Sequence, residues 1–149
     1  MPSSPELSSL YDVLRLALGD NISNTAKNFI DLFAEDVLFE FPYAPPEGVQ
    51  ALHGKTELAE YLPKVGKLIS IESLSLNRVI LSEDKTSAVL EFTCKGVGTE
   101  TDFRYDQTYI SVVDITNKLI SRYRDYWNPL IVLSATGGLE SMSKTLKGN

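Results

Sequence analysis

The second half of the chain constrains the fold most, because four long segments with strand periodicity follow one another there. The segments at residues 69–82, 86–98, 102–115 and 118–128 alternate apolar and polar side chains, and short polar stretches separate them. Alternation with a period of two predicts strands that bury one face. These segments are therefore expected to form about four long antiparallel strands.

The first half of the chain has helical periodicity instead. Apolar residues spaced i, i+3, i+4, i+7 predict one helix that ends near Gly19, a second within residues 21–36 and a third within residues 55–68. A short alternating strand at residues 37–43 and a loop rich in proline and glycine at residues 44–54 lie between the second and third helices.

This order of elements predicts an α+β fold, in which a curved antiparallel β-sheet wraps around helices to form a cone. A length of 149 residues suits a single domain. Its core is expected at about residues 8–138, with a polar, frayed tail from residue 137. A curled sheet would leave a pocket between its concave face and the helices.

Charge and cysteine content restrict the partners and the compartment. The net charge is −6, and no two of the 14 basic residues are adjacent, which disfavours nucleic acid and anionic membranes. The single cysteine, Cys94, permits no intramolecular disulfide and indicates a reducing compartment. The start of the chain lacks the features of a signal peptide, and no apolar run is long enough to span a bilayer. A cytoplasmic protein without a membrane partner is expected.

The last two strands carry acids beside aromatic residues. If residues 116–117 form a two-residue hairpin turn, Asp125 lies opposite Thr108, and Asp106 lies opposite Trp127. Directly opposed residues share a face of the sheet. Both acids would then lie on one face, and the arginines and tyrosines of this hairpin would mostly lie on the other.

If the face with the acids is concave, Asp106 and Asp125 lie in an apolar cup, on the order of 7–8 Å apart at Cα. Burial and the neighbouring carboxylate would both raise the pKa of a carboxyl group there. Such a group can hold or transfer a proton near neutral pH, so both acids are candidate catalytic residues.

Two alternatives remain open for this hairpin. The faces can be reversed, in which case both acids are solvated and the tyrosines pack inside. A three-residue turn would change the register and decouple the two faces. The long arginine side chains favour the first orientation, because their stems can cover apolar surface on an outer face.

Further candidates for the pocket wall are the aromatic and polar residues Phe41, Tyr43, Thr108, Tyr123 and Trp127. His53 is the only histidine, and it could line the pocket mouth, shuttle a proton, or simply precede and cap a helix. The aromatic residues could equally be ordinary core packing. One histidine, no cysteine cluster and dispersed carboxylates predict no metal site.

The order of elements, together with FEFPYAPPEGVQALHGKTELAEYL at 39–62 and ISRYRDYWNPLIVLSATGG at 120–138, resembles the SnoaL-like branch of the nuclear transport factor 2-like superfamily. That superfamily includes ketosteroid isomerase, polyketide cyclases and limonene epoxide hydrolase. The likeness spans most of residues 8–138 and is strongest to the phenazine-biosynthesis A/B proteins. They carry a similar hairpin, with an acidic residue in the place of Asp125 followed by aromatic or apolar residues and Asn-Pro.

The resemblance implies a cone closed by helices and a homodimer formed through the outer face of the sheet. It gives Asp125 an acid/base role, and Asp106 matches an acidic position in the same hairpin. The pocket histidine of the phenazine relatives appears here as Lys55, with His53 two residues earlier. The tyrosine donor of the isomerase has only Tyr11 as a rough match.

Two functions follow from these observations. The first is an isomerase, cyclase or lyase that needs no cofactor and uses Asp125 to transfer a proton on a small, apolar, carbonyl-bearing metabolite. The second is a non-catalytic ligand-binding or dimeric assembly module of the same fold. A ligand-sized pocket of about 300 Å³ or more would favour the first, and a cone filled by large side chains would favour the second.

Overall fold

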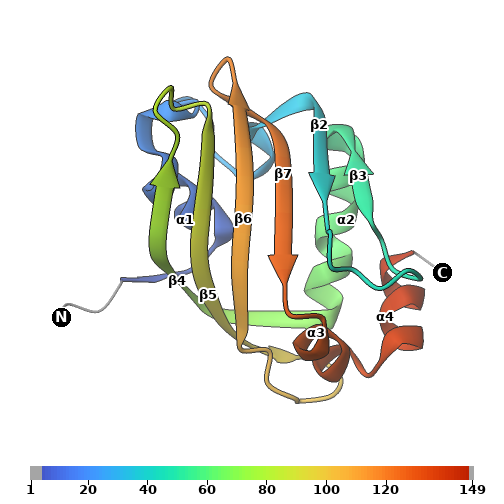
Figure 1. The fold of residues 1–149 in the computed structure, drawn as a ribbon. Coiled ribbons are helices and arrows are strands. Elements are labelled where there is room, and N and C mark those ends of the chain that lie inside the picture. Colours follow the sequence, from blue (N-terminus) through green and yellow to red (C-terminus); the bar gives the residue numbers. More distant parts are fainter. Residues whose placement is uncertain (1–4, 148–149) are drawn as a thin grey trace.

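The core of the fold is a curved, seven-stranded sheet, seen in a computed structural model that describes residues 5–147 (Figure 1). The strands are β1 (Glu6–Leu7), β2 (Phe33–Glu40), β3 (Ala51–His53), β4 (Ile69–Leu81), β5 (Ser87–Gly98), β6 (Gln107–Thr116) and β7 (Leu119–Trp127). Their order across the sheet is β1-β4-β5-β6-β7-β2-β3, so the sheet is open. All paired strands are antiparallel except β2 and β7, which are parallel.

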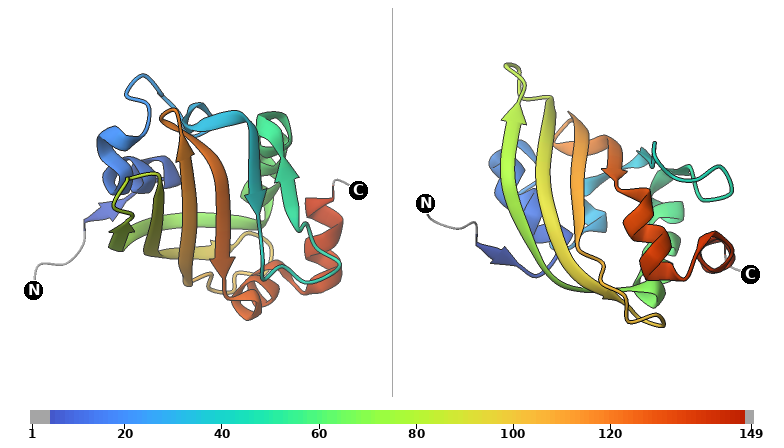
Figure 2. Two further views of the ribbon diagram at one scale, coloured as in Figure 1. Left: turned by 45° about the horizontal axis from the view of Figure 1, so that its top comes forward. Right: turned by 60° about the horizontal axis from the view of Figure 1, so that its bottom comes forward.

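Four helices accompany the sheet: α1 (Leu10–Leu18), α2 (Gly54–Leu68), α3 (Pro129–Thr136) and α4 (Leu139–Leu146). Figure 2 shows the long strands bending around the helical side of the molecule. The prediction of a curved sheet around helices, an α+β cone, is therefore confirmed. None of the helices described in residues 5–147 is both long enough and apolar enough to cross a membrane.

Local sequence explains the two helices that were predicted correctly. The Ser9 hydroxyl accepts a hydrogen bond from the backbone N–H of Asp12 and so caps α1, which buries Val13, Leu14 and Leu18. In α2 the i, i+4 and i+7 spacing of Leu58, Leu62 and Val65 turns one side of the helix toward the sheet.

Strand periodicity also fixes which face of the sheet is buried. Every second residue of β5 from Ala88 to Cys94 is buried, and the residues between them are more exposed. In β6 the buried residues are Gln107, Ser111, Val113 and Ile115, with Tyr109 between them on the same face. These residues form the concave face, against which the helices pack.

The predicted second helix within residues 21–36 is wrong. Two short 3₁₀ turns, at Gly19–Asn21 and Ile30–Leu32, occupy this region, and strand β2 begins at Phe33. Polar side chains hold the intervening chain in turns: the side chain of Asn28 accepts from the backbone N–H of Asp31. The apolar residues whose spacing predicts a helix lie instead in a 3₁₀ turn and at the start of strand β2. Strand β2 pairs in parallel with β7.

The expectation of a frayed tail is also wrong for the described residues. The chain after β7 forms α3 and then α4, where Met142 and Leu146 are buried. The side chain of Asn128 caps α3 by accepting from the N–H of Leu130, Pro129 follows the cap, and Gly137 ends the helix in the left-handed region.

The register of the β6–β7 hairpin differs from the prediction. The turn residues are Asn117 and Lys118, both with positive φ, rather than residues 116–117. A bulge at Ser121 then shifts the pairing by one residue, so that Asp125 lies opposite Ser111. Beyond the bulge, each residue of β7 therefore shares a face of the sheet with a different set of β6 residues than the predicted register gives.

Candidate functional site

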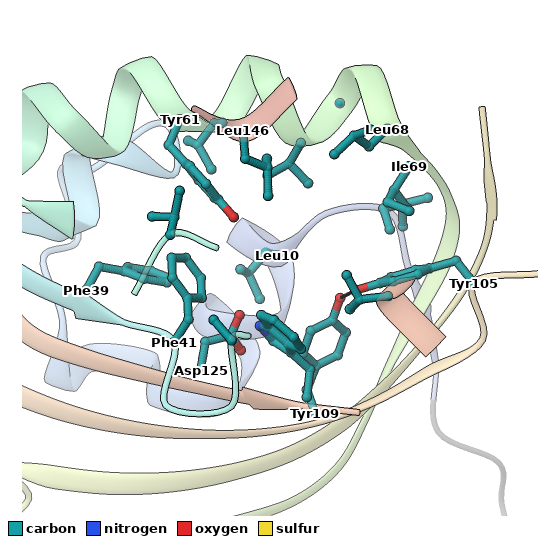
Figure 3. Close-up of a pocket in the computed structure, with 18 of the residues that line it drawn as sticks. Leu10, Phe39, Phe41, Tyr61, Leu68, Ile69, Tyr105, Tyr109, Asp125 and Leu146 are labelled. Atoms are coloured by element: carbon teal, nitrogen blue, oxygen red, sulfur yellow. Dashed lines mark hydrogen bonds between the residues drawn. The ribbon is translucent and has the colours of Figure 1, made fainter. Parts of the chain in front are cut away.

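A cavity of about 370 Å³ lies between the concave face of the sheet and helices α2 and α4. Its wall is mostly apolar and includes Phe41, Leu58, Leu62, Phe92, Trp127 and Met142. A few polar groups interrupt this wall: Asp125, Tyr61, Tyr105, Tyr109 and Thr136, with Ser8 and Ser9 near the N-terminus of α1. Figure 3 shows how the labelled side chains converge on the cavity from the sheet below and from α2 above.

Asp125 is the only acidic residue in the wall of this cavity within the described part of the chain. The alternation of β7 turns Tyr123, Asp125 and Trp127 toward the concave face. The carboxyl group accepts one long hydrogen bond, from the hydroxyl of Ser111 at 3.4 Å. Burial raises the pKa of Asp125 to about 7, and the Ser111 hydrogen bond opposes this rise.

Tyr61 approaches Asp125 from the opposite wall. It lies on α2, three residues after Leu58, and its hydroxyl points down into the cavity (Figure 3). Burial raises the pKa of Tyr61, and the negative charge of Asp125 raises it further. The phenol is therefore neutral at physiological pH and can donate a hydrogen bond.

Tyr105 and Tyr109 form a hydrogen-bonded pair beside Asp125, called here the tyrosine pair. Their hydroxyl oxygens are 2.7 Å apart. The ring of Tyr109 is stacked on Phe92 at a centroid distance of 4.8 Å. Burial raises the pKa of both phenols, so both remain protonated.

Three of the predicted site residues lie together at the cavity. Asp125, Phe41 and Trp127 all line it, and the rings of Phe41 and Trp127 are 6.3 Å apart. The predicted orientation of β7, with Asp125 facing the concave side and Arg122 and Arg124 facing outward, agrees with the structure.

The predicted partner acid, Asp106, lies elsewhere. Its side chain is 55% exposed and forms an ion pair with Arg104 at 2.7 Å, so the pKa of its carboxyl is lowered. Thr108 is exposed on the same outer face. The bulge at Ser121 explains both corrections, because it leaves Asp106 and Thr108 on the face of the sheet opposite to the one that carries Asp125. The interpretation of Asp106 and Asp125 as a carboxylate pair is wrong.

Three other predicted or tentative positions are also outside the cavity wall. His53 is exposed, and it precedes α2 without capping the helix through its side chain. Tyr43 is 59% exposed and its ring meets Tyr126 edge-on, away from the concave face. Tyr11 donates its hydroxyl hydrogen bond to the carbonyl oxygen of Ala26.

Tyr123 faces the concave side but belongs to the core rather than to the cavity wall. It is fully buried and its ring is stacked on Phe39 at 4.4 Å. Its hydroxyl has no hydrogen-bond partner among residues 5–147. Its ring therefore packs in the core, and burial together with the charge of Asp125 raises the pKa of its phenol.

The sequence reasoning missed Tyr61, Ser111 and the tyrosine pair. Tyr61 could have been found, because it lies at i+3 from Leu58 on the predicted inner side of the third helix. The predicted register, which lacks the bulge, puts Ser111, Tyr105 and Tyr109 on the face opposite to that of Asp125. No sequence pattern marks Ser121 as a bulge residue.

This arrangement can perform proton chemistry on an apolar ligand. A carboxyl group with a pKa near 7 accepts and donates protons readily at neutral pH. Neutral phenols nearby can donate hydrogen bonds to an oxygen that gains negative charge. Within the described residues, no group of three histidine, cysteine or acidic side chains is placed to hold a metal ion.

Comparisons with known proteins place this fold in a family. The family model described as SnoaL-like domain matches residues 22–123. An uncharacterised PhzA/B-like protein from Pseudomonas aeruginosa is 32% identical over 123 residues, which cover 83% of this chain and 86% of that protein.

Solved structures agree with this assignment. A Bacillus subtilis protein named as a "putative isomerase" is 36% identical, with a TM-score of 0.73 and coverage of 87% of this chain and 93% of that one. A Catenulispora acidiphila protein with a ketosteroid isomerase-like fold, solved in complex with trimethylamine, matches with a TM-score of 0.63. The match covers 86% of this chain and 94% of that one. At 11% identity, this likeness shows the fold alone. The fold is that of nuclear transport factor 2-like proteins, and the chain belongs to the SnoaL-like domain family.

Proposed function

We propose that this protein is an acid/base catalyst that transfers a proton on a small, apolar, carbonyl-bearing metabolite, as an isomerase, cyclase or lyase does. The observation that carries this proposal is the Asp125 carboxyl, whose pKa is raised to about 7 in the wall of an apolar cavity of about 370 Å³. That volume falls within the range of about 300–1,000 Å³ typical of small-molecule sites.

The proton transfer can be written with this chain's own groups. The ionised carboxylate of Asp125 removes a proton from the carbon next to the ligand carbonyl. The C–H bond breaks, its electron pair forms a carbon–carbon double bond, and the carbonyl π electrons move to oxygen as an enolate. Delivery of this proton from Asp125 to another carbon gives isomerisation. Replacement of the proton on Asp125 by one from solvent, before a proton is returned to the same carbon, gives hydrogen exchange. Neither outcome changes the oxidation state.

The surroundings of Asp125 support this role. At a pKa of about 7, both protonation states of Asp125 are populated at neutral pH, so one residue can act as base and then as acid. The aromatic wall suits a flat apolar ligand. A relative that is 36% identical carries the name of an isomerase, which agrees with proton transfer but does not identify a ligand.

The direct test measures exchange of the α-hydrogens of an apolar ketone probe, 2-tetralone, for deuterium in D₂O by NMR. We expect the wild-type protein to accelerate exchange above the buffer rate and Asp125→Asn to lose about 10²- to 10⁴-fold of that acceleration. The amide keeps the shape of the side chain but cannot take the proton. Asp106→Asn is the matched control, because it changes an acid on the outer face and should leave the rate unchanged.

A non-catalytic ligand-binding protein is the second candidate. It is favoured by the composition of the cavity wall, which contains no lysine, arginine or histidine among the described residues. Asp125 would then be the only group able to move a proton at neutral pH. Binding of 2-tetralone without accelerated exchange, or equal exchange by wild type and Asp125→Asn, would favour this alternative over the enzyme.

A further inference from the structure

The tyrosine pair has one hydroxyl proton more than its own hydrogen bond uses. A phenol carries one donor proton and can also accept. The bond between Tyr105 and Tyr109, with 2.7 Å between the oxygens, consumes one of the two protons whichever hydroxyl donates. Within residues 5–147, neither hydroxyl has a second acceptor for its proton, and the amide side chain of Gln107 lies on the accepting side of the Tyr105 oxygen. One donor is thus left over at the cavity wall.

The pair is held rigidly in place. Phe92 lies beneath the ring of Tyr109, with an angle of 12° between the ring planes. The backbone N–H of Tyr105 donates to the carbonyl of Gly96 at 2.9 Å, and the carbonyl of Tyr105 lies 3.8 Å from the thiol of Cys94. Fixed rings and a mutual hydrogen bond restrict the directions that the spare proton can take. A preorganised donor of this kind loses little entropy on binding a ligand.

The position of the pair relative to Asp125 limits the ligand. Tyr109 lies opposite Trp127 and diagonally across from Asp125 in the β6–β7 register. Figure 3 shows Tyr109 rising beside Asp125, with its hydroxyl turned toward Tyr105 on the side away from Phe39. The rest of the wall around them is largely apolar. A ligand would therefore meet an acid and a hydrogen-bond donor at two separate points of an apolar cavity.

We propose that the tyrosine pair is the binding site for the ligand's oxygen, and that the ligands of this cavity are apolar compounds whose carbonyl oxygen accepts the spare hydroxyl proton while an adjacent C–H group faces Asp125. This inference rests on the proposed function in taking the ligand to be a carbonyl compound. The hydrogen bond strengthens as the carbonyl oxygen becomes an enolate, so the pair would lower the barrier as well as bind the ligand.

The test compares two probes of one shape, 2-tetralone and its hydrocarbon counterpart tetralin, by NMR titration. We expect wild type to bind the ketone about 3- to 10-fold more tightly than the hydrocarbon, as one added neutral hydrogen bond permits. The double variant Tyr105→Phe/Tyr109→Phe should bring this ratio close to one and leave tetralin affinity unchanged. Unchanged tetralin affinity also shows that the cavity has kept its shape.

Tyr61→Phe is the matched control, since it removes a cavity hydroxyl from the opposite wall. It should keep the preference for the ketone. If Tyr61→Phe lost the ketone preference and the double variant kept it, the hydrogen-bond donor to the ligand oxygen would lie on α2, and the inference would be overturned. A wild-type ratio of one, or an equal loss of both ligands in the double variant, would also overturn it. If the double variant does not fold, the single variants Tyr105→Phe and Tyr109→Phe make the same comparison, and retention of the full ketone preference in both would overturn the inference.

The two proposals can fail separately. Asp125→Asn should lose exchange but keep its preference for 2-tetralone over tetralin, because the tyrosine pair is intact. A ketone preference without any exchange in wild type would contradict the catalytic proposal alone. Exchange that depends on Asp125 but not on the tyrosine pair would contradict the present inference alone.

Discussion

The Asp125 carboxyl lies among aromatic side chains and accepts one long hydrogen bond, from the Ser111 hydroxyl. The resulting rise of its pKa supports the proposed proton transfer, and it also lowers the stability of the folded protein at neutral pH. Between the ordinary pKa of 3.8 and about 7, the folded state binds more protons at this site than the unfolded state does. Stability contributed by the protonated group is therefore lost as pH rises through this window.

The substitution Asp125→Asn should make the protein more stable at pH 8. By linkage, the charged carboxyl costs on the order of 4 kcal/mol above pH 7, of which we expect the amide to recover about 1–3 kcal/mol. Urea unfolding at several pH values measures this. The difference between variant and wild type should shrink from pH 7 toward pH 4 and stay constant above pH 7.

Asp106→Asn is the control for this prediction. The Arg104 guanidinium lowers the pKa of Asp106, so its charge does not oppose folding and the amide should bring no gain at pH 8. A gain in stability from Asp125→Asn that is equal at all pH values would show that repacking, rather than removal of a buried charge, is responsible.

At the scale of elements, the cover of the cavity depends on how α3 packs at the end of β5. Gly98 is buried there, and a Cβ atom at this position would collide with the backbone carbonyl oxygen of Ala135. The hydroxyl of Thr101 donates to the same carbonyl at 2.7 Å and holds it in place. Since α3 contributes Val132 and Thr136 to the cavity wall, this close approach helps to close the cavity.

Gly98→Ala should therefore destabilise the protein by ~1–3 kcal/mol, because the backbone of α3 must move to admit the methyl group. Gly66→Ala is the matched control within α2, where an added Cβ meets no atom within 4 Å. It should stabilise the protein by about 0.5–1 kcal/mol, since alanine restricts the unfolded chain and favours the helix. Thermal or urea unfolding distinguishes the two, and equal effects would contradict this packing.

The elements also show what the sequence could predict. Long alternating strands β4 to β7 and helices α1 and α2 follow from periodicity. The α3 signals, an asparagine cap followed by proline and a later glycine, are present at Asn128, Pro129 and Gly137, but no element is predicted from the sequence at residues 129–136. The false second helix arose because Phe29, Ile30 and Phe33 have helical spacing, whereas pairing with β7 decides the structure there.

The bulge at Ser121 had the largest effect on the predicted site. Moving the turn to residues 117–118 changes the pairing by two positions and leaves each side chain on its face. One extra residue in β7 changes the pairing by one more position and therefore turns the β6 partners to the other face. Asp125 was placed correctly because its own strand fixes its side, and Asp106 was placed wrongly because its position depended on the register.

At the scale of the whole molecule, the cone was predictable from the order of elements, and its interior was not. The concave face surrounds the cavity, while the outer face carries Ile80, Val89 and Val112 in one cross-strand row beside Arg124. Ile80 is 47% exposed and Ile110, on the same face, is 44% exposed. A homodimer through this face stays a prediction, which sedimentation equilibrium can test.

The whole fold brings Asp125, Tyr61 and the tyrosine pair together from β7, α2 and the region of β6. The proposed function requires Asp125 to titrate near neutral pH inside this cavity. The most direct measurement is a pH titration of the aspartate side-chain carboxyl carbons by ¹³C NMR, with the Asp125 signal identified by its loss in Asp125→Asn. We expect that signal to titrate with a pKa of about 7. Titration near 3.8, the ordinary value, would contradict the proposed proton chemistry.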